Sequence, residues 1–313
     1  MNVIPIICPL CHGSLSEDRD HTLRCCQCAA IYPRRATADV LLTDAEWAEY
    51  LQEWEQEKDF LLERYSTARR RALLEIMYYD MWAARMFALI PPECTGPLLE
   101  IMAGEGELVR RRPPQITSTV MFDINVNALE RAAQYFMSTG ETRIQVVGGT
   151  VGHLPFPAES FNIVMVQGGL HHVRSQLSRV LAEVHRVLRP GGILVGSEPA
   201  NDCWLTRRIR HWQYKTSKHQ GNDRGEDGFT RAELNALLSA IGFDLKHYTT
   251  FGFIAYPLMG NIDLLPFLTK SRSRILGKTL LGIDALLECI PLIRNCAWAN
   301  LFQAYKKPNG RDL

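Results

Sequence analysis

The chain has 313 residues, and its 35 Lys and Arg nearly balance 34 Asp and Glu, which leaves a formal net charge of +1. A composition of 46% hydrophobic and 22% charged residues is typical of a globular protein with a buried core, and it excludes a disordered chain, a collagen-like repeat and a small disulfide scaffold. The near-neutral charge also excludes a globally basic nucleic-acid-binding surface, although it permits a local basic patch.

The first 28 residues contain two pairs of cysteines in C-x-x-C spacing, separated by 13 residues (25 − 11 − 1). Each pair can turn two thiolates toward one ion, and two pairs complete the tetrahedral geometry that Zn²⁺ prefers. Because four thiolates leave no open coordination position, we predict a structural zinc site. Cys26, His12 and His21 lie nearby and are alternative ligands that a four-sulfur site does not need. The four predicted ligands are Cys8, Cys11, Cys25 and Cys28.

Beyond the cysteine pairs, this segment contains Tyr32-Pro33 and ends in Val40-Leu41-Leu42. With these features, the stretch from Ile7 to Leu42 resembles the zinc-ribbon module of the small activator subunits of tRNA methyltransferases. The resemblance implies that residues 1–43 form a zinc ribbon. A zinc finger also begins the rRNA guanine methyltransferases, which makes RNA one possible partner, whereas other ribbons are fused to enzymes with no nucleic-acid role.

Residues 44–96 have the pattern of two helices and are interpreted as a helical linker or lid. The first helix, Asp44–Glu63, has one apolar face and many acidic residues, and Thr43 with Glu46 forms a capping box at its start. The second helix covers Ser66–Leu89 and ends before two prolines.

After Pro97, short apolar runs alternate with helical patterns, which predicts a parallel sheet buried on both faces. In such open sheets a ligand binds at the carboxyl ends of the strands. The predicted strands are Leu98–Met102, Val120–Ile124, Ile144–Val147, Phe161–Val166, Ile193–Ser197, Phe243–Tyr248 and Asn300–Lys306. The predicted helices between them are Leu108–Arg112, Val126–Met137, Gln176–Leu188 and Arg231–Ala240.

The loop after the first of these strands contains Gly104 and Gly106, and glycines allow a backbone to approach a ligand closely. About twenty residues further on, Asp123 lies near the end of the second strand, where it can accept hydrogen bonds from a ribose diol. A nicotinamide dinucleotide is therefore one candidate ligand. The loop lacks the third glycine of the G-x-G-x-x-G motif in the required register, which disfavours that candidate.

Three further strings are specific when taken together: Leu154-Pro155-Phe156-Pro157 followed by Ser160-Phe161, then Leu170-His171-His172, then Leu188-Arg189-Pro190-Gly191-Gly192. With the glycine loop, they resemble class I S-adenosylmethionine (SAM) methyltransferases of the ubiquinone/menaquinone type. The resemblance covers about Leu98–Phe243, and Leu301–Lys306 is similar to the last strand of that family. It implies an α/β fold with a Rossmann-like, seven-stranded, mostly parallel sheet over residues 97–313, in which the final strand is antiparallel.

The resemblance also assigns SAM-binding positions residue by residue. Glu100 to Gly106 would hold the methionine part of SAM, and Asp123, followed by Ile124, would hold the ribose. The loop after the third strand would lie beside the adenine, and the end of the fourth strand would lie near the sulfonium. The implied cofactor-binding residues are Glu100, Met102, Ala103, Gly104, Gly106, Asp123, Ile124, Gly149, Thr150, Val151, Gln167 and Gly168.

Four positions depart from the family pattern. The family has glycine where Met102 and Glu107 stand, an acid that accepts from the adenine amine where Gly149 stands, and Asp where Asn162 stands. Met102 could crowd the methionine pocket, and one lost hydrogen bond to the adenine costs about 1 kcal/mol. These departures leave open a catalytically silent SAM-fold module that binds or activates a partner.

His171 and His172 follow the fourth predicted strand, where an acceptor would approach the sulfonium. An imidazole suits removal of a proton from an acceptor, so both are candidate catalytic bases, and packing is the alternative role of either ring. Glu198, after the fifth strand, is a weaker candidate for holding substrate. His153 and His185 are interpreted as structural.

The segment of about residues 199–230 is interpreted as a lid insertion. Between Trp204 and Gln220 it has five bases, no acid and three aromatic residues, which suits either an anionic acceptor or a solvated basic helix. About residues 261–296 are predicted to add helices over the pocket, which favours a small, enclosed or partly lipidic acceptor. The five bases are Arg207, Arg208, Arg210, Lys215 and Lys218.

No segment has the pattern of a transmembrane helix or a secretory signal. Met1–Leu10 has no Lys or Arg, and the apolar stretch Leu280–Leu292 is too short and contains Asp284, Glu288 and Pro291. We therefore predict a cytoplasmic SAM-dependent methyltransferase acting on a small molecule, in secondary-metabolite or surface-glycan synthesis. The alternatives are an RNA base methyltransferase that uses the ribbon, and the catalytically silent module.

Overall fold

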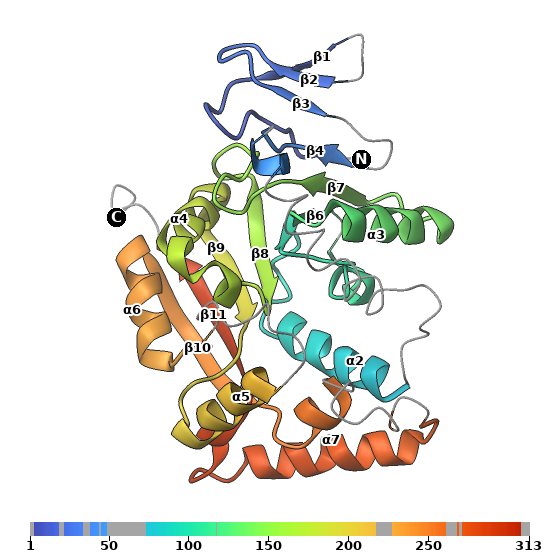
Figure 1. Ribbon diagram of the computed structural model, residues 1–313, viewed down its shortest axis with the longest axis vertical. Helices are drawn as coiled ribbons and strands as arrows, with labels where there is room; N and C mark the ends of the chain where they lie inside the picture. Colours follow the sequence, from blue (N-terminus) through green and yellow to red (C-terminus); the bar gives the residue numbers. More distant parts are fainter. Residues whose placement is uncertain are drawn as a thin grey trace.

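The computed structural model describes residues 3–18, 22–33, 38–43, 45–48, 73–116, 118–216, 227–260, 268 and 271–307. A small N-terminal sheet lies at one end of the molecule and a large sheet forms its body, with helices α5 and α7 at the opposite end (Figure 1).

The small sheet is antiparallel and consists of β1 (Leu15–Glu17), β2 (Thr22–Cys25) and β3 (Ile31–Pro33). The chain then enters the large sheet, because β4 (Asp39–Val40) pairs in parallel with β7. The backbone N–H of Ile7 also donates to the carbonyl of Pro155 in the body (2.9 Å). The last residues assigned to the ribbon from sequence therefore form an edge strand of the large sheet.

The large sheet has the order β10-β11-β9-β8-β5-β6-β7-β4 among the described residues. All seven predicted strands are present, β4 is an additional eighth strand, and β11 alone is antiparallel to its neighbours. The predicted Rossmann-like, mostly parallel fold is therefore confirmed. The seven strands are β5 (Leu98–Ile101), β6 (Thr119–Asp123), β7 (Ile144–Gly148), β8 (Phe161–Gln167), β9 (Leu188–Ser197), β10 (Phe243–Phe251) and β11 (Ala299–Lys306).

Burial explains why these strands have continuous apolar sequences. Every residue of β5 and of β6 is buried, since helices cover the sheet. Of the four helices predicted between the strands, three are confirmed as α3, α4 and α6, whereas Leu108–Arg112 is only a short 3₁₀ turn, η1 (Val109–Arg111). Helix α2 lies within the predicted helix Ser66–Leu89. The helices are α2 (Leu73–Phe87), α3 (Val126–Ser138), α4 (Leu177–Val187), α5 (Trp204–Thr216), α6 (Arg231–Ile241) and α7 (Arg274–Glu288).

The predicted linker or lid begins with the capping box that the sequence predicted. The N–H of Thr43 donates to Glu46 Oε2 (2.8 Å), and the N–H of Glu46 donates to Thr43 Oγ1 (3.3 Å). Residues 45–48 are helical, and the remainder of the predicted acidic helix lies outside the described residues. Helix α2 packs on the body, where Trp82 Nε1 donates to Ser197 Oγ at the carboxyl end of β9 (2.9 Å).

Within the described residues, no helix combines the length and the apolar character that crossing a membrane requires.

Candidate cofactor and active site

The loop after β5 has the backbone geometry of a ligand-binding turn. Gly104 and Gly106 have positive φ angles of 51° and 74°, and a Cβ on Gly106 would lie 2.7 Å from the Met121 methyl group. Glycine is therefore required at position 106. A Cβ on Gly104 would meet no atom within 4 Å, so the loop faces open space at that point. Ala103, which precedes Gly104, is buried.

Asp123, at the end of β6, is held in place by backbone donors. Its Oδ2 accepts from the N–H of Gly104 and its Oδ1 from the N–H of Asn125, both at 2.7 Å. Burial raises the pKa of this carboxyl, and the backbone N–H groups act in the opposite direction. Ile124, the next residue, is an exposed apolar side chain.

Glu100 is buried beneath the same loop. It accepts one hydrogen bond, from the N–H of Val109 to Oε2 (3.3 Å). Burial raises its pKa from an ordinary 4.5 to about 8, so the carboxyl is mostly protonated at neutral pH in the free protein. A ligand ammonium beside it would favour the ionised form.

The predicted adenine side is built from two parts of the chain. At Gly149, a Cβ would lie 2.9 Å from the Phe122 ring, so this position has little room for the acid of the family pattern. A carboxylate comes instead from Glu46, whose Oε1 accepts from Thr150 Oγ1 (3.3 Å) while its Oε2 accepts from Thr43. The capping box indicated Glu46 in the sequence, but its contact across 104 residues could not be read there. Val151 is buried behind this loop.

The end of β8 faces the glycine loop. The Nε2 of Gln167 is buried and has no hydrogen-bond partner, which makes it an available donor at the predicted sulfonium side. Gly168 has a φ of 62°, and a Cβ there would meet no atom within 4 Å. Met102, with a φ of 56°, lies against Gly169, where an added Cβ would be 2.9 Å from the Met102 Cβ. Met102 therefore narrows the space between the two loops.

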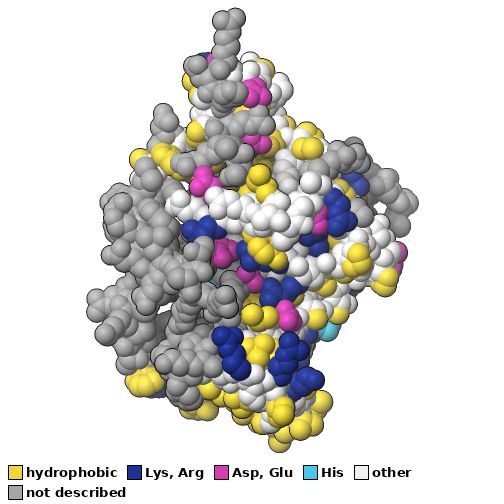
Figure 2. Space-filling view, turned by 90° about the vertical axis from the view of Figure 1, so that its right-hand side faces the viewer, with side chains coloured by type: hydrophobic (Ala, Val, Ile, Leu, Met, Phe, Trp, Pro, Cys, Tyr) yellow, Lys and Arg dark blue, Asp and Glu magenta, His cyan; other side chains and the backbone are white. Residues whose placement is uncertain are grey.

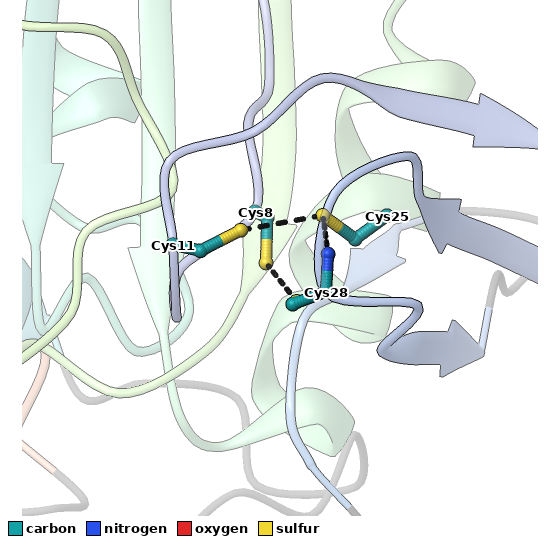
Figure 3. A group of neighbouring side chains, drawn as sticks. All are labelled: Cys8, Cys11, Cys25 and Cys28. Atoms are coloured by element: carbon teal, nitrogen blue, oxygen red, sulfur yellow. Dashed lines mark hydrogen bonds between the residues drawn. The ribbon is translucent and has the colours of Figure 1, made fainter.

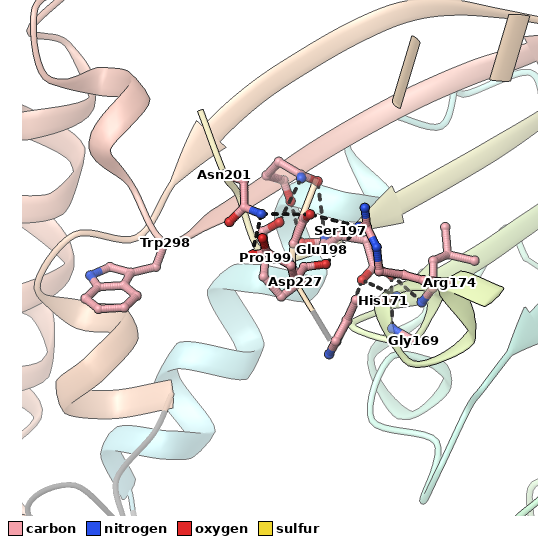
Figure 4. A network of polar contacts seen from close by, with 12 residues as sticks. Gly169, His171, Arg174, Ser197, Glu198, Pro199, Asn201, Asp227 and Trp298 are labelled. Atoms are coloured by element: carbon pink, nitrogen blue, oxygen red, sulfur yellow. Dashed lines mark hydrogen bonds and ion pairs between the residues drawn. The ribbon is translucent and has the colours of Figure 1, made fainter. Parts of the chain in front are cut away.

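His171 is held by the buried carboxylate of Glu198, as Figure 4 shows. The His171 Nδ1 lies 2.7 Å from Glu198 Oε2, and Glu198 also accepts from the backbone N–H groups of Gly169, Leu170 and His171 (3.0, 2.8 and 3.3 Å). With the proton on Nδ1, the Nε2 of His171 is a free base. The suggestion that Glu198 holds substrate is therefore wrong: it positions His171 and the turn η2 (Leu170–Gln176).

His172 is exposed and lies beside His171, with ring centroids 3.9 Å apart. His172 also acts on the pKa of Asp123, which it lowers against the larger and opposite effect of burial. The two histidines are thus brought together, and the Nδ1 of His171 lies at hydrogen-bonding distance from the Glu198 carboxylate.

Two of the four departures from the family pattern are bound to arginine side chains. Glu107 forms an ion pair with Arg111 (2.6 Å), and Asn162 Oδ1 accepts from Arg189 Nη1 (2.9 Å) next to Gly96.

The basic lid helix is partly used by the fold itself. Arg210 is buried and donates to the carbonyls of Ala200 and Trp298 (3.0 and 2.8 Å), and Arg207 pairs with Asp227 (2.6 Å). Arg208 is exposed, and the side chains of Lys215 and Lys218 lie outside the described residues. Two of the three lid bases whose side chains the structure describes are therefore bound to groups of the protein.

The four cysteines of the N-terminal pairs converge on one point, as Figure 3 shows. All four Sγ atoms lie within 4.8 Å of one another, with Cys8 to Cys28 at 3.6 Å and Cys11 to Cys25 at 3.4 Å. Zinc–sulfur bonds of about 2.3 Å in a tetrahedron imply sulfur–sulfur distances of about 3.8 Å, so the donor set fits Zn²⁺.

The two cysteine pairs have the same local structure. The residue after each pair has a positive φ, His12 at 60° and Ala29 at 59°, and its N–H donates to the carbonyl of the first cysteine. This turn directs both thiols of a pair to the same side. The N–H groups of Cys28 and Gln27 donate to Cys25 Sγ and lower the pKa of this thiol to about 6, while the pKa values of the neighbouring Cys11 and Cys28 thiols are raised.

Comparison with known proteins supports a methyltransferase domain. Residues 99–196 match a family model described as a methyltransferase domain. The chain is 32% identical over 102 residues to the ubiquinone/menaquinone biosynthesis C-methyltransferase UbiE of Coxiella burnetii, and the match covers 31% of this chain and 40% of that protein. The chain thus spans about two fifths of the length of this relative.

Solved structures share the fold. The YcgJ protein of Bacillus subtilis matches 74% of this chain and 100% of its own, with a TM-score of 0.53 and 17% identity. A chain from the complex between the Haloferax volcanii Trm112 methyltransferase activator and a protein described as a methyltransferase matches 83% of this chain and 97% of its own, with a TM-score of 0.51 and 17% identity. The class I methyltransferase fold is therefore shown.

Replacing Glu100 by Gln tests the buried carboxyl through the pH dependence of stability. Between pH 4.5 and 8 the folded state keeps a proton that the unfolded state has released, so wild-type stability falls as pH rises through this window. Glu100→Gln cannot ionise, so its free energy of unfolding relative to wild type should rise by up to roughly 1.4 kcal/mol per pH unit. Urea denaturation from pH 5 to 8 measures this, with Glu93→Gln, an exposed position, as control. A pH-independent difference would contradict the assignment.

Proposed function

We propose that the protein is a SAM-dependent methyltransferase acting on a small-molecule acceptor. One observation carries the proposal: the open glycine loop, the positioned Asp123 and the unpartnered Gln167 amide all lie at the carboxyl ends of β5, β6 and β8, beside the His171–Glu198 pair. This is where a parallel sheet binds its ligand. The match of residues 99–196 to a methyltransferase domain supports the same conclusion.

Different residues would hold the methionine, ribose and adenine parts of SAM. Glu100 and the loop through Gly106 suit the methionine ammonium, Asp123 suits the ribose hydroxyls, and Glu46 suits the adenine amine. When bound, SAM supplies an electrophilic methyl group on its sulfonium. The protein contributes alignment of the acceptor with that group, which supplies much of the acceleration in a displacement reaction.

His171 is proposed as the base that accepts the acceptor's proton at Nε2. Glu198 fixes the tautomer and stabilises the imidazolium through Nδ1. A small-molecule acceptor agrees with the printed name of the Coxiella burnetii relative, which acts in quinone biosynthesis. The role in secondary-metabolite or surface-glycan synthesis and the cytoplasmic location remain predictions.

The four cysteines are proposed to bind a structural Zn²⁺. Four thiolates leave no coordination position for substrate, so the ion would stabilise the small sheet. Cys8 and Tyr32 of this sheet are in the same buried cluster as Leu154 and Phe156 of the body, and the chain then continues to β4 and Glu46. Zinc would therefore also support the adenine side of the site.

An RNA substrate is the weaker proposal. Among the lid bases whose side chains the structure describes, Arg210 is buried and Arg207 is paired, which leaves Arg208 to contact a phosphate. Met102 narrows the space between the loops that follow β5 and β8, and this observation favours a catalytically silent module. A SAM titration distinguishes a silent module that does not bind SAM from the enzyme.

The cofactor proposal predicts that the protein binds SAM and S-adenosylhomocysteine in calorimetry. Glu46→Gln should weaken binding several-fold, since one hydrogen bond to the adenine contributes about 1 kcal/mol, and Glu93→Gln should bind like wild type. Absence of binding by the wild type would contradict the enzyme proposal. Equal binding by Glu46→Gln would contradict only the role of Glu46.

His171→Asn should lower kcat by about 10²- to 10⁴-fold while the affinity for S-adenosylhomocysteine stays unchanged, because the base acts on the acceptor. Release of S-adenosylhomocysteine with a panel of quinol, phenol and amine acceptors provides the assay. Glu198→Gln should alter the pH profile of kcat, which a purely structural change would not do. His247→Asn, exposed on β10, is the matched control. A kcat within twofold of wild type for His171→Asn would refute its role as base.

Metal analysis of the purified chain should find one zinc per molecule. Cys8→Ser and Cys25→Ser should lose the metal and lower the melting temperature, whereas Cys26→Ser, at an exposed cysteine outside the cluster, should keep both. Full zinc occupancy in the Cys25→Ser variant would show that the four-cysteine assignment is wrong.

A further inference from the structure

Helix α5 presents an apolar face with bases to solvent. Its buried side is formed by Thr206 and Arg210, which are one turn apart. Trp204, Arg208 and Trp212 follow one another at four-residue intervals on the opposite side, and all three are exposed. The sequence of α5 contains no acidic residue.

Helix α7 has the same organisation. Gly277, Leu280 and Asp284 form its buried side. The opposite side carries Ile275 and Leu286, both strongly exposed, and continues past the helix to Leu292, which is 92% exposed. Exposed bases accompany this side; they are Arg272, Arg274, Lys278 and Arg294.

The two acidic residues between Arg272 and Arg294 are Asp284 and Glu288, and both side chains point into the protein. Asp284 accepts from the backbone N–H groups of Phe253, Ile254 and Ala255 (2.9, 2.7 and 3.1 Å). Glu288 pairs with Arg85 (2.8 Å). The outward side of α7 is therefore apolar and positively charged, with no acid among its described residues.

The two helices lie at the same end of the molecule (Figure 1). Helix α5 packs against η7 (Arg294–Cys296), the turn two residues beyond Leu292, so Leu292 lies near the junction of the two helices. Figure 2 shows hydrophobic and basic side chains gathered at this end. Half of the exposed large apolar side chains of the described residues, eight of sixteen, belong to residues 204–212 and 275–292.

We propose that this face, formed by the outward sides of α5 and α7 and by Leu292, docks on an anionic lipid bilayer. Tryptophan, leucine and isoleucine side chains can enter the headgroup region, while arginine and lysine contact anionic lipids. A bilayer matches both properties at once, since a neutral apolar partner would leave the bases unpaired. Helix α5 begins six residues after Glu198, so the docked end is continuous with the carboxyl edge of the sheet where the site lies.

Sedimentation with vesicles tests this proposal on the full chain. The wild type should bind vesicles that contain phosphatidylglycerol and bind those of phosphatidylcholine alone weakly, and the binding should weaken as salt is raised. Leu292→Ser and Leu286→Ser should each reduce the partition coefficient about tenfold. Lys278→Glu should reduce binding to anionic vesicles only. Met137→Ser is the matched control, because Met137 and Leu286 are both 71% exposed and Met137 lies on α3.

Three outcomes would overturn the proposal. The first is no binding to either vesicle, and the second is unchanged binding of the Leu286 and Leu292 variants. The third is a wild type that does not bind vesicles but forms a dimer in sedimentation velocity, or a complex with single-stranded RNA. In that case the Leu286 and Leu292 variants would lose the dimer or the RNA complex. Calorimetry with S-adenosylhomocysteine verifies that each variant is folded. Because vesicle sedimentation needs no methyl acceptor, its outcome does not depend on whether the protein transfers a methyl group.

Discussion

The carboxylate of Glu198 accepts hydrogen bonds from three successive backbone N–H groups and from the His171 ring, and the acceptor side of the site depends on it. These four interactions satisfy a buried carboxylate that would otherwise be costly. The backbone N–H of Glu198 donates in turn to Asn300 Oδ1 (3.2 Å), which joins β9 to β11. The position of the His171 ring, the proposed base, is therefore tied to the sheet through Glu198.

The cofactor side depends on a second long-range junction, the pairing of β4 with β7. Leu41, just after β4, donates its N–H to the carbonyl of Gly148 (2.7 Å), and this contact places Glu46 beside Thr150. The Phe122 ring fills the space next to Gly149 at the same point. The N-terminal segment thus places a carboxylate beside the loop after β7, next to a position that has little room for one.

The sequence predicted what depends on local pattern. Seven strands, three helices and the capping box at Thr43 were recovered because apolar periodicity and hydrogen bonding between near neighbours determine them. Sequence-based prediction failed where the role of a residue depends on contacts with residues that are distant in the sequence. The roles of Glu46 and Glu198 require partners 104 and 27 residues away, and Leu108–Arg112 is only a 3₁₀ turn although its pattern resembles a helix. The assigned roles of the SAM positions stay predictions, although Gly104, Asp123, Gln167 and Gly168 do lie together at one edge.

The near-neutral charge of the chain is the sum of an uneven distribution. Asp284 and Glu288 lie in the same apolar segment as exposed bases, yet both carboxylates face inward and bind backbone N–H groups or Arg85. Because both carboxylates bind groups inside the protein, the outer side of α7 carries a positive charge. Between Arg272 and Arg294 the sequence has four bases and two acids, and the fold separates the two signs across the helix. The positive charge of the outer side therefore comes both from the excess of bases and from the inward contacts of the two acids.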